Sequence, residues 1–247
     1  IVVLAVILFL VTKVDKMEAT EIDASDITFN EGIGNGGEAS SEVPEAMKGY
    51  RNIALFGVDS RNGALGKGTL SDTILVASIN EDTKEVRLIS IFRDTYLNLG
   101  NDTYNKANNA YSKGGPKQAI NMLNMNLDLN ITDYVTVGFQ GVVDTVDALG
   151  GVEIEVDEAE ISHLNNYQIG TSEAIGRKNQ YTKVTSTGMQ NLDGLQATSY
   201  CRIRYTAGDD FKRAERQREV IQAIAQKVKG ASASQINEIA NNVFSQT

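Results

Sequence analysis

Cysteine and histidine are nearly absent from this sequence of 247 residues, which contains only Cys201 and His163. A lone cysteine forms neither an intrachain disulfide nor a cysteine metal cluster, and Cys201 lies in a stretch of alternating apolar residues. We therefore expect a buried structural thiol. A Ser-His-Asp or Cys-His mechanism would depend on His163, whose surroundings, ISHLNNYQ, offer it no support.

Basic residues are outnumbered, and tryptophan and proline are rare. The 23 Lys and Arg residues stand against 32 Asp and Glu residues, which gives a formal net charge of -9. General nucleic-acid binding needs a broad basic surface, so we expect no nucleic-acid partner. With no Trp and only 2 Pro, collagen-like and proline-rich classes are excluded as well. Any anion-binding site must therefore be local.

The first residues form the apolar run IVVLAVILFLV. A membrane-spanning helix needs about 20 such residues, and the sequence begins inside the run. We interpret residues 1–12 as the outer end of a truncated transmembrane anchor; the alternative is a core helix of the globular domain. Residues 13–48 are acidic and rich in glycine, without helical or strand periodicity, which predicts a linker. Residues 49–247 are expected to form one globular domain.

Short apolar runs alternate with helical patterns from Tyr50 onward. Five runs are typical of strands covered on both faces: NIALFGV, TILVASI, VRLISIF, YVTVGF and VEIEV. Strands that alternate with helices predict an α/β fold, a three-layer α/β/α sandwich.

Three helices are predicted between and after these strands. The first starts at Pro116, which suits a first helical turn. The second ends at Gly150 or Gly151 in a left-handed stop. The third starts near Phe211, capped by Asp209 or Asp210. The inward stripes of the first two helices are expected to be Ala119, Ile120, Leu123 and Leu127, and Val142, Val143, Val146 and Leu149.

Half of the ten arginines lie within seventeen positions near the end of the sequence: Arg202, Arg204, Arg213, Arg216 and Arg218. If YCRIRY is a strand, Arg202 and Arg204 share one face. On the following helix Arg213, Arg216 and Gln217 share a face near the N-terminus, where the helix dipole is positive.

Several guanidinium groups aimed at one region suit a group with several negative charges, such as a pyrophosphate, better than a lone carboxylate. The alternative is that these arginines are solvated helix charges that pair with Glu215 and Glu219.

Aspartates stand at the ends of several predicted strands. Asp59 directly follows one strand and Asp72 directly precedes another, while Arg93 and Asp94 follow a third. Ligand sites of α/β proteins gather at strand ends. Two carboxylates beside an arginine cluster suit Mg²⁺ on a diphosphate, because Mg²⁺ prefers one or two carboxylates plus phosphate oxygens. The alternative is that each aspartate only caps a turn.

The order of these motifs resembles the LytR-CpsA-Psr family of cell-wall glycopolymer transferases. The resemblance covers about residues 50 to 221, and Lys212 departs from it at a position where the family often has glycine. Seven stretches follow the family order: NIALFGVDSR, SDTILVASIN, VRLISIFRDTYL, NKANNAYSKGGP, DYVTVGFQGVVDTVDALGGVEIEV, MQNLDGLQATSYCRIRY and DDFKRAERQREVI.

The resemblance implies a membrane-anchored phosphotransferase on the extracellular face of a Gram-positive bacterium. Such an enzyme moves a glycopolymer, for example teichoic acid or capsule, from a polyprenyl-pyrophosphate carrier to a muramic acid hydroxyl of peptidoglycan, forming a phosphodiester. Its fold has a central mixed sheet and a long apolar lipid pocket. The alternatives are a polyprenyl-pyrophosphate pyrophosphatase and a non-catalytic lipid-binding regulator.

The resemblance also implies roles for individual residues. Asp59 and Asp72 would bind Mg²⁺, with Mn²⁺ as the alternative metal. The catalytic set would be Arg93, Asp94, Asp59 and Asp72, with Asp94 or one of the two metal-site aspartates as the base. The pyrophosphate-binding set would be Arg93, Lys106, Arg202, Arg204, Arg213 and Gln217.

Overall fold

The computed structural model describes residues 22–31, 33, 43–60, 64–232 and 234–237. The described chain divides into two compact units, unit 1 up to Thr136 and unit 2 from Val137 onward, with Ser60 assigned to unit 2. The expected anchor, residues 1–12, lies outside the described residues. Within the described ranges, no helix is both long and apolar enough to cross a membrane.

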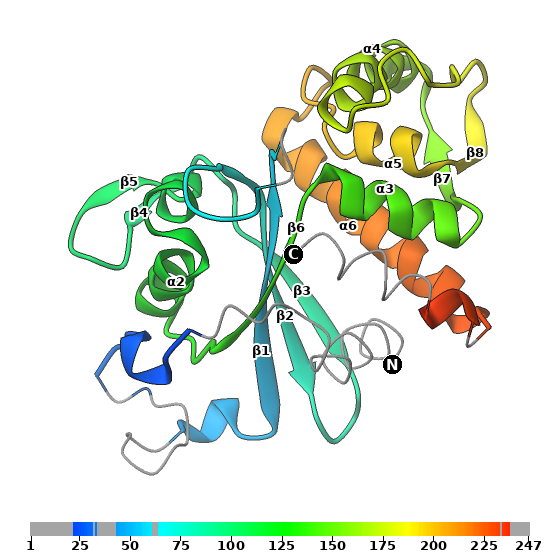
Figure 1. Ribbon diagram of the computed structural model, residues 1–247. Helices are drawn as coiled ribbons and strands as arrows, with labels where there is room; N and C mark the ends of the chain where they lie inside the picture. The colour runs from blue at the N-terminus through cyan, green and yellow to red at the C-terminus, as the bar shows by residue number, and fades with distance from the viewer. Residues whose placement is uncertain (1–21, 32, 34–42, 61–63, 233, 238–247) are drawn as a thin grey trace. The chain divides into compact units, whose positions relative to one another are not determined.

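Unit 1 is built on a four-stranded sheet (Figure 1). The sheet has the order β3-β2-β1-β6, and β2 pairs antiparallel with both β1 and β3. On β2 the four apolar residues 74–77 are all buried, as expected for a strand covered on both faces, whereas on β1 buried and partly buried residues alternate from Ala54 to Val58. Four predicted strands are thereby confirmed: β1 (Tyr50–Val58), β2 (Ser71–Asn80), β3 (Val86–Ser90) and β6 (Asp133–Val137).

A small hairpin and a long helix complete unit 1. The hairpin consists of β4 (Tyr96–Asn98) and β5 (Tyr104–Lys106), and it leads into α2 (Asn108–Leu127). A kink at Gly115, with φ 69° and ψ -160°, divides α2, and Pro116 opens its second segment. The predicted start at Pro116 therefore holds for that segment only.

The inward face of α2 matches the prediction except at one end. Ala119, Ile120 and Leu123 are buried, whereas Leu127 is 40% exposed, so its assignment to the core was wrong. Leu127 is the last residue of the helix. The apolar stripe therefore covers the core over fewer turns than the sequence pattern indicates.

Part of the expected linker packs against unit 1. Residues 22–31, which include the short helix η2 (Ala24–Asp26), bring Ile27 into the core. The backbone N–H of Thr28 donates to Asn121 Oδ1 at 2.9 Å, and Lys117 pairs with Asp26 at 2.8 Å. A second short helix, η3 (Glu45–Met47), precedes β1. The composition that predicted a linker therefore does not prevent residues 22–31 from docking on α2.

Among the described residues, unit 2 contains the helices α3, α4, α5 and α6 and a two-stranded sheet (Figure 1). The helices are α3 (Phe139–Ala148), α4 (Glu158–Ala174), α5 (Gly194–Tyr200) and α6 (Asp209–Lys229), and β7 (Val152–Val156) pairs antiparallel with β8 (Gly188–Leu192). Val143 and Val146 of α3 are buried as predicted. Gly150 and Gly151 both have positive φ, which confirms the left-handed stop after α3.

The stretch YCRIRY is not a strand, contrary to the prediction. Tyr200 ends α5, and the chain then turns: the N–H of Arg202 donates to Ser199 O at 3.0 Å, and that of Ile203 to Tyr200 O at 3.2 Å. The alternation also fails, because Tyr205 is 75% exposed. A capping box between Asp193 and Gln196 starts the helix that displaces the expected strand.

The predicted cap of the last helix is also wrong. Gly208, with φ 98°, is the N-cap of α6, so Asp209 and Asp210 lie in the first helical turn. Acidic side chains in a first turn still interact favourably with the helix dipole. The two aspartates therefore stabilise the start of α6 through the helix dipole and not as its N-cap.

Candidate functional site

Asp59 and Asp72 lie at the same end of the β1–β2 ladder. Val58 pairs with Ser71, whereas Gly57 pairs with Thr73, so Asp72 is the extra residue of a bulge in β2. A bulge bends its strand and redirects the side chain that it carries. Asp59 follows directly, with its N–H donating to Leu70 O at 3.2 Å. The ladder thus brings the two predicted carboxylates to one end of the sheet.

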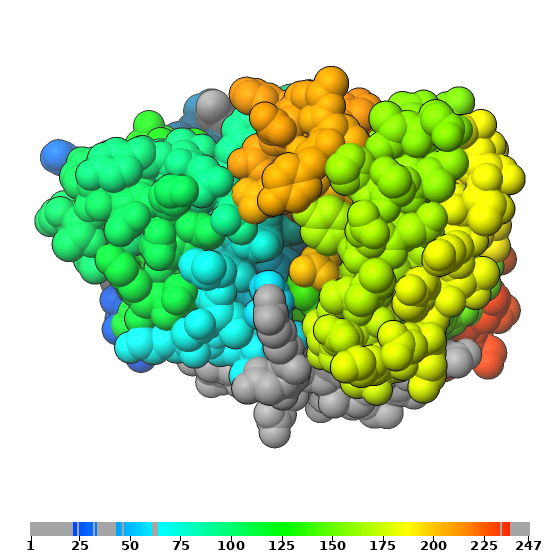
Figure 2. Space-filling view, turned by 90° about the horizontal axis from the view of Figure 1, so that it is seen from above, coloured from blue at the N-terminus to red at the C-terminus, as the bar shows by residue number. Residues whose placement is uncertain are grey.

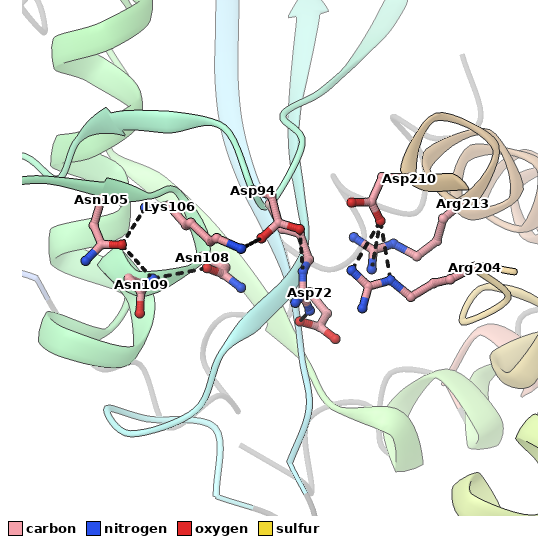
Figure 3. Close-up of polar contacts among 10 residues, drawn as sticks. Asp72, Asp94, Asn105, Lys106, Asn108, Asn109, Arg204, Asp210 and Arg213 are labelled. Carbon is pink, nitrogen blue, oxygen red and sulfur yellow. Dashed lines mark hydrogen bonds and ion pairs between the residues drawn. The ribbon is translucent and has the colours of Figure 1, made fainter. Parts of the chain in front are cut away.

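A row of alternating charges starts at Asp72. Arg93 Nη1 donates to Asp72 Oδ1, and Arg93 Nε lies 3.5 Å from Asp94 Oδ2. Lys106 Nζ lies 2.8 Å from Asp94 Oδ1 (Figure 3). We call Asp72, Arg93, Asp94 and Lys106 the ion-pair chain. Within unit 1, Arg93 is therefore held between two carboxylates, and Lys106 ends the row on Asp94.

Hydrogen bonds from the start of α2 fix the backbone of the residues that form the ion-pair chain. Arg93 O accepts the N–H of Asn108 at 3.1 Å, and Thr95 O accepts the N–H of Ala107 at 2.8 Å. Asn105 Oδ1 accepts the N–H of Lys106 at 2.8 Å and the amide of Asn109 at 3.2 Å. Because these bonds join the loop after β3 to β5 and α2, the charged side chains project from a fixed frame.

The pKa of Asp94 is lowered from its ordinary value. The hydrogen bond from Lys106 contributes most, the charge of Arg93 also lowers the pKa, and burial opposes both. A carboxylate with two cationic partners and a lowered pKa is a weak proton acceptor near neutral pH. The geometry therefore favours Asp94 as a fixed negative charge that orients Arg93 and Lys106.

Arg204 and Arg213 of unit 2 converge on one carboxylate oxygen (Figure 3). Asp210 Oδ1 lies 3.3 Å from Arg204 Nη2 and 3.4 Å from Arg213 Nη1. The Arg213 side chain is 7% exposed, and that of Arg204 33%. The segment that carries them, orange in Figure 2, forms part of the surface in that view. Two guanidinium groups on one oxygen make a site for an acceptor with several negative oxygens.

Arg202 is held by three residues that sequence reasoning missed. Its Nη1 donates to Thr171 Oγ1 at 2.8 Å. Its Cζ lies 4.5 Å from the ring centroid of Phe139 and 5.5 Å from that of Tyr167. Cation–π contacts and a charge-assisted hydrogen bond restrict this side chain. The sequence contains one signal that could have indicated these residues. The capping box of Asp157 and Glu160 marks the start of α4, the helix that carries Tyr167 and Thr171.

Three arginines act on the phenol of Tyr167. Burial raises its pKa, and the positive charges of Arg202, Arg204 and Arg213 lower it. The contacts given above place the Arg202 guanidinium over the Tyr167 ring and the other two guanidinium groups on Asp210. We call Arg202, Arg204 and Arg213 the arginine group.

Arg213, Arg216 and Gln217 share one face of α6, as predicted, and that face is buried. Arg216 does not belong to the arginine group, because its guanidinium is bonded to other residues in the interior of unit 2. It pairs with Glu160 at 2.8 Å and donates to Ile203 O at 3.1 Å. Gln217 is 8% exposed. Of the four arginines expected to converge, three form the group and the fourth is structural.

Two further predictions concern metal binding and Cys201. Among the described residues, no set of three or more His, Cys, Asp or Glu side chains is arranged to hold a metal ion. Asp59 and Asp72 are two carboxylates at one strand end, a donor set that suits Mg²⁺ when phosphate oxygens supply further ligands. Cys201 is partly buried at the edge of the core of unit 2, not fully buried as predicted. Burial nevertheless raises the pKa of its thiol to about 12, which favours a structural role.

The site residues therefore form two sets, one in each unit. Unit 1 holds the ion-pair chain with Asp59 at the same end of the sheet, and unit 2 holds the arginine group with Gln217 on the buried face of α6. Chemically, the first set offers two cations beside carboxylates, and the second offers three guanidinium groups with one carboxylate, Asp210, among them. Each set by itself carries cations that can bind the oxygens of a multiply charged anion.

Curated proteins with related sequences include teichoic acid transferases and, in Streptococcus mutans, biofilm regulatory protein A. The chain is 34% identical over 179 residues to the polyisoprenyl-teichoic acid–peptidoglycan teichoic acid transferase TagU of Enterococcus faecalis, covering 72% of this chain and 53% of that protein. It is 30% identical over 227 residues to TagV of Bacillus subtilis, covering 89% and 54%. The chain thus spans about half the length of the curated relatives it matches.

Solved structures share the fold. The crystal structure of B. subtilis TagV matches with a TM-score of 0.62 at 28% identity, covering 80% of this chain and 72% of that one. TagT bound to LI-WTA matches with a TM-score of 0.61 at 25% identity, covering 82% and 78%. The predicted α/β fold with a central mixed sheet is confirmed. Since the sequence model of the LytR_cpsA_psr family also matches residues 8–247, the chain belongs to that family.

Proposed function

We propose that this protein transfers a teichoic acid or a similar glycopolymer from a polyprenyl-pyrophosphate carrier to peptidoglycan. The observation that carries the proposal is the convergence of Arg204 and Arg213 on a single oxygen of Asp210. The names of the related transferases supply the substrate classes, a polyisoprenyl-linked teichoic acid as donor and peptidoglycan as acceptor.

The arginine group binds the pyrophosphate of the donor. A diphosphate presents several negative oxygens where Asp210 presents one carboxylate, so it can engage Arg204 and Arg213 more fully. Arg202 adds a third guanidinium, already oriented by Thr171 and Phe139. Because these contacts exist before the donor binds, little side-chain entropy is lost when the donor arrives.

The ion-pair chain acts on the phosphate that is transferred. Arg93 and Lys106 stabilise negative charge on its oxygens, and Asp94 keeps both cations oriented. Asp59 and Asp72 would hold Mg²⁺ or Mn²⁺, which when bound supplies additional neutralisation of phosphate charge. The lowered pKa of Asp94 argues against Asp94 as the proton acceptor, so Asp59 and Asp72 are the remaining candidates.

The proposed reaction is a phosphoryl transfer. The muramic acid hydroxyl of the acceptor attacks the phosphorus that bears the glycopolymer, and a new P–O bond forms. The P–O bond to the lipid-side phosphate breaks, so polyprenyl phosphate leaves with the electron pair. The hydroxyl proton passes to a strand-end carboxylate. The products are polyprenyl phosphate and a phosphodiester between the glycopolymer and peptidoglycan, with one proton released.

The proposal includes the place where the protein works. A lipid-linked donor and a peptidoglycan acceptor meet at the outer face of the membrane of a Gram-positive bacterium. We place the catalytic domain on that extracellular face, anchored through residues 1–12, with an apolar pocket for the polyprenyl chain.

A reconstituted transfer assay tests the proposed function. The full chain in detergent is incubated with a short-chain polyprenyl-pyrophosphate glycan, a peptidoglycan oligomer and Mg²⁺, and the products are read by mass spectrometry. We expect a glycan-phosphate adduct on the peptidoglycan that Arg93→Ala fails to form. Free phosphorylated glycan without adduct would indicate a pyrophosphatase instead. Binding of the donor without any product would indicate a lipid-binding regulator.

A further inference from the structure

The β4–β5 hairpin displays two stacked tyrosines on its outer face. Tyr96 and Tyr104 have ring centroids 6.0 Å apart and an interplanar angle of 26°. They are also 70% and 58% exposed. A diagonal ring pair stabilises a short hairpin, but that role does not require so much exposed aromatic area. Exposed aromatic area of this kind is typical of interaction sites.

The strand register defines what surrounds the rings. Tyr96 pairs with Lys106, and Asn98 pairs with Tyr104, so these four side chains share one face. The opposite face carries Leu97, which packs against the core. Neither strand contains a carboxylate. The side-chain amide of Asn98 bonds within the turn, to Gly100 N–H and to Asp102. The face therefore presents two aromatic rings and one ammonium group, and in Figure 1 the hairpin lies at the periphery of unit 1.

The hairpin is held firmly on α2. The side chain of Asn126 donates to Asn98 O at 2.7 Å and accepts from Asn98 N–H at 3.2 Å. Leu99, directly after β4, is completely buried. A surface that is fixed before its partner binds loses little entropy on binding, so the tyrosines form a preorganised platform.

The platform is continuous with the candidate catalytic centre. Lys106 belongs to the tyrosine face, and its Nζ lies 2.8 Å from Asp94 Oδ1 in the ion-pair chain. A molecule bound on the tyrosines therefore lies within unit 1 beside the residues that we assign to phosphoryl transfer. This continuity indicates a substrate of the reaction.

We propose that Tyr96 and Tyr104 bind the glycan strand of the peptidoglycan acceptor, an inference that rests on the proposed function. Pyranose rings present apolar C–H faces that stack on tyrosine. The donor sugar is positioned through its pyrophosphate by cations. The acceptor brings a neutral hydroxyl without a phosphate, so its binding must come from non-ionic contacts.

Kinetics of the reconstituted transfer test this assignment. We expect Tyr96→Ala and Tyr104→Ala to raise the KM for the peptidoglycan oligomer about tenfold each, as for a central aromatic contact. The KM for the donor and the affinity for polyprenyl pyrophosphate should not change. Tyr96→Phe, which keeps the ring, should behave like the wild type. Met189→Ala, at an exposed apolar residue of β8, is the control.

The outcomes separate this inference from the proposed function. If the wild type transfers and the tyrosine variants keep its acceptor KM, the inference is wrong and the function stands. If the wild type shows no transfer, a binding experiment tests the inference by itself. A peptidoglycan oligosaccharide titrated into the full chain should then shift the ring NMR signals of Tyr96 and Tyr104. Unshifted signals, or shifts with the donor glycan alone, would overturn the assignment. Melting temperatures show whether each variant is folded.

Discussion

Arg216 and Glu160 form an ion pair that is almost completely buried, with Nε and Oε1 2.8 Å apart and side chains 1% and 3% exposed. The same guanidinium donates to Thr206 Oγ1 at 2.6 Å and to Ile203 O. One side chain of α6 thus fixes the start of α4 and the loop that carries Arg204. The arginine that sequence reasoning placed with the anion binders instead holds their loop.

Replacement of Arg216 by alanine should therefore destabilise the fold. Loss of one partner leaves Glu160 buried without its counter-charge, and we expect the free energy of unfolding to fall by about 3 to 5 kcal/mol. Chemical denaturation measures the change. Lys229→Ala, at an exposed position of the same helix, should change the free energy by less than about 0.5 kcal/mol. Equal stabilities of the two variants would contradict the structural role of Arg216.

Thr171 should act as a positioning residue for Arg202. Thr171→Val keeps the shape of the side chain but removes the oxygen that accepts from Arg202 Nη1. We expect the transfer rate to fall about tenfold, because without this hydrogen bond the Arg202 guanidinium is no longer held in one orientation. Thr171→Ser, which restores the hydroxyl, should recover most of the rate. If Val and Ser variants of equal stability transfer equally well, Thr171 does not position Arg202.

Asp94 should remain ionised throughout the physiological pH range. Its pKa is lowered in the folded protein, first by Lys106 and then by Arg93. Its contribution to stability is therefore present above the unfolded pKa of about 3.9 and is lost as the pH falls through the folded pKa. A carboxyl NMR titration should show this pKa rising in Lys106→Met. An Asp94 pKa that is the same in both proteins would contradict the ion-pair chain.

The thiol of Cys201 should take no part in the chemistry. Because burial raises its pKa to about 12, little thiolate exists at pH 8 and iodoacetamide should label the native protein only slowly. Labelling should become rapid in denaturant. Cys201→Ala should transfer at the wild-type rate. Rapid native labelling together with loss of transfer in this variant would require a catalytic role for the thiol.

Strands β1 and β2 could be predicted because both contain runs of apolar residues in the sequence, although only β2 buries such a run without a break. The ends of β1 and β2, and with them Asp59 and Asp72, followed from these runs. The bulge at Asp72 could not be predicted, since it depends on the pairing register of two strands. The sequence therefore predicts that Asp72 lies at a strand end, but it does not predict the direction of the Asp72 side chain.

Unit 2 was harder to predict because its helices bury polar groups. α4 buries Glu160, Gln168 and Thr171, so no apolar stripe marks it. In YCRIRY the alternation of Cys201, Ile203 and Tyr205 imitates a strand, while the structure follows the capping box at Asp193. The strand argument that made Arg202 a candidate was wrong, and its role stays a prediction: tertiary contacts with Phe139 and Thr171, not strand alternation, orient the side chain.

Transfer by Arg202→Ala tests the central claim most directly. The variant is compared with the wild type and with Lys229→Ala in the reconstituted assay, and the melting temperature of each protein is measured. We predict that Arg202→Ala stays folded but loses transfer by at least about 100-fold, because a preorganised donor to the pyrophosphate is missing. Lys229→Ala should transfer normally. Near-normal transfer by folded Arg202→Ala would contradict the assignment of the arginine group to the pyrophosphate.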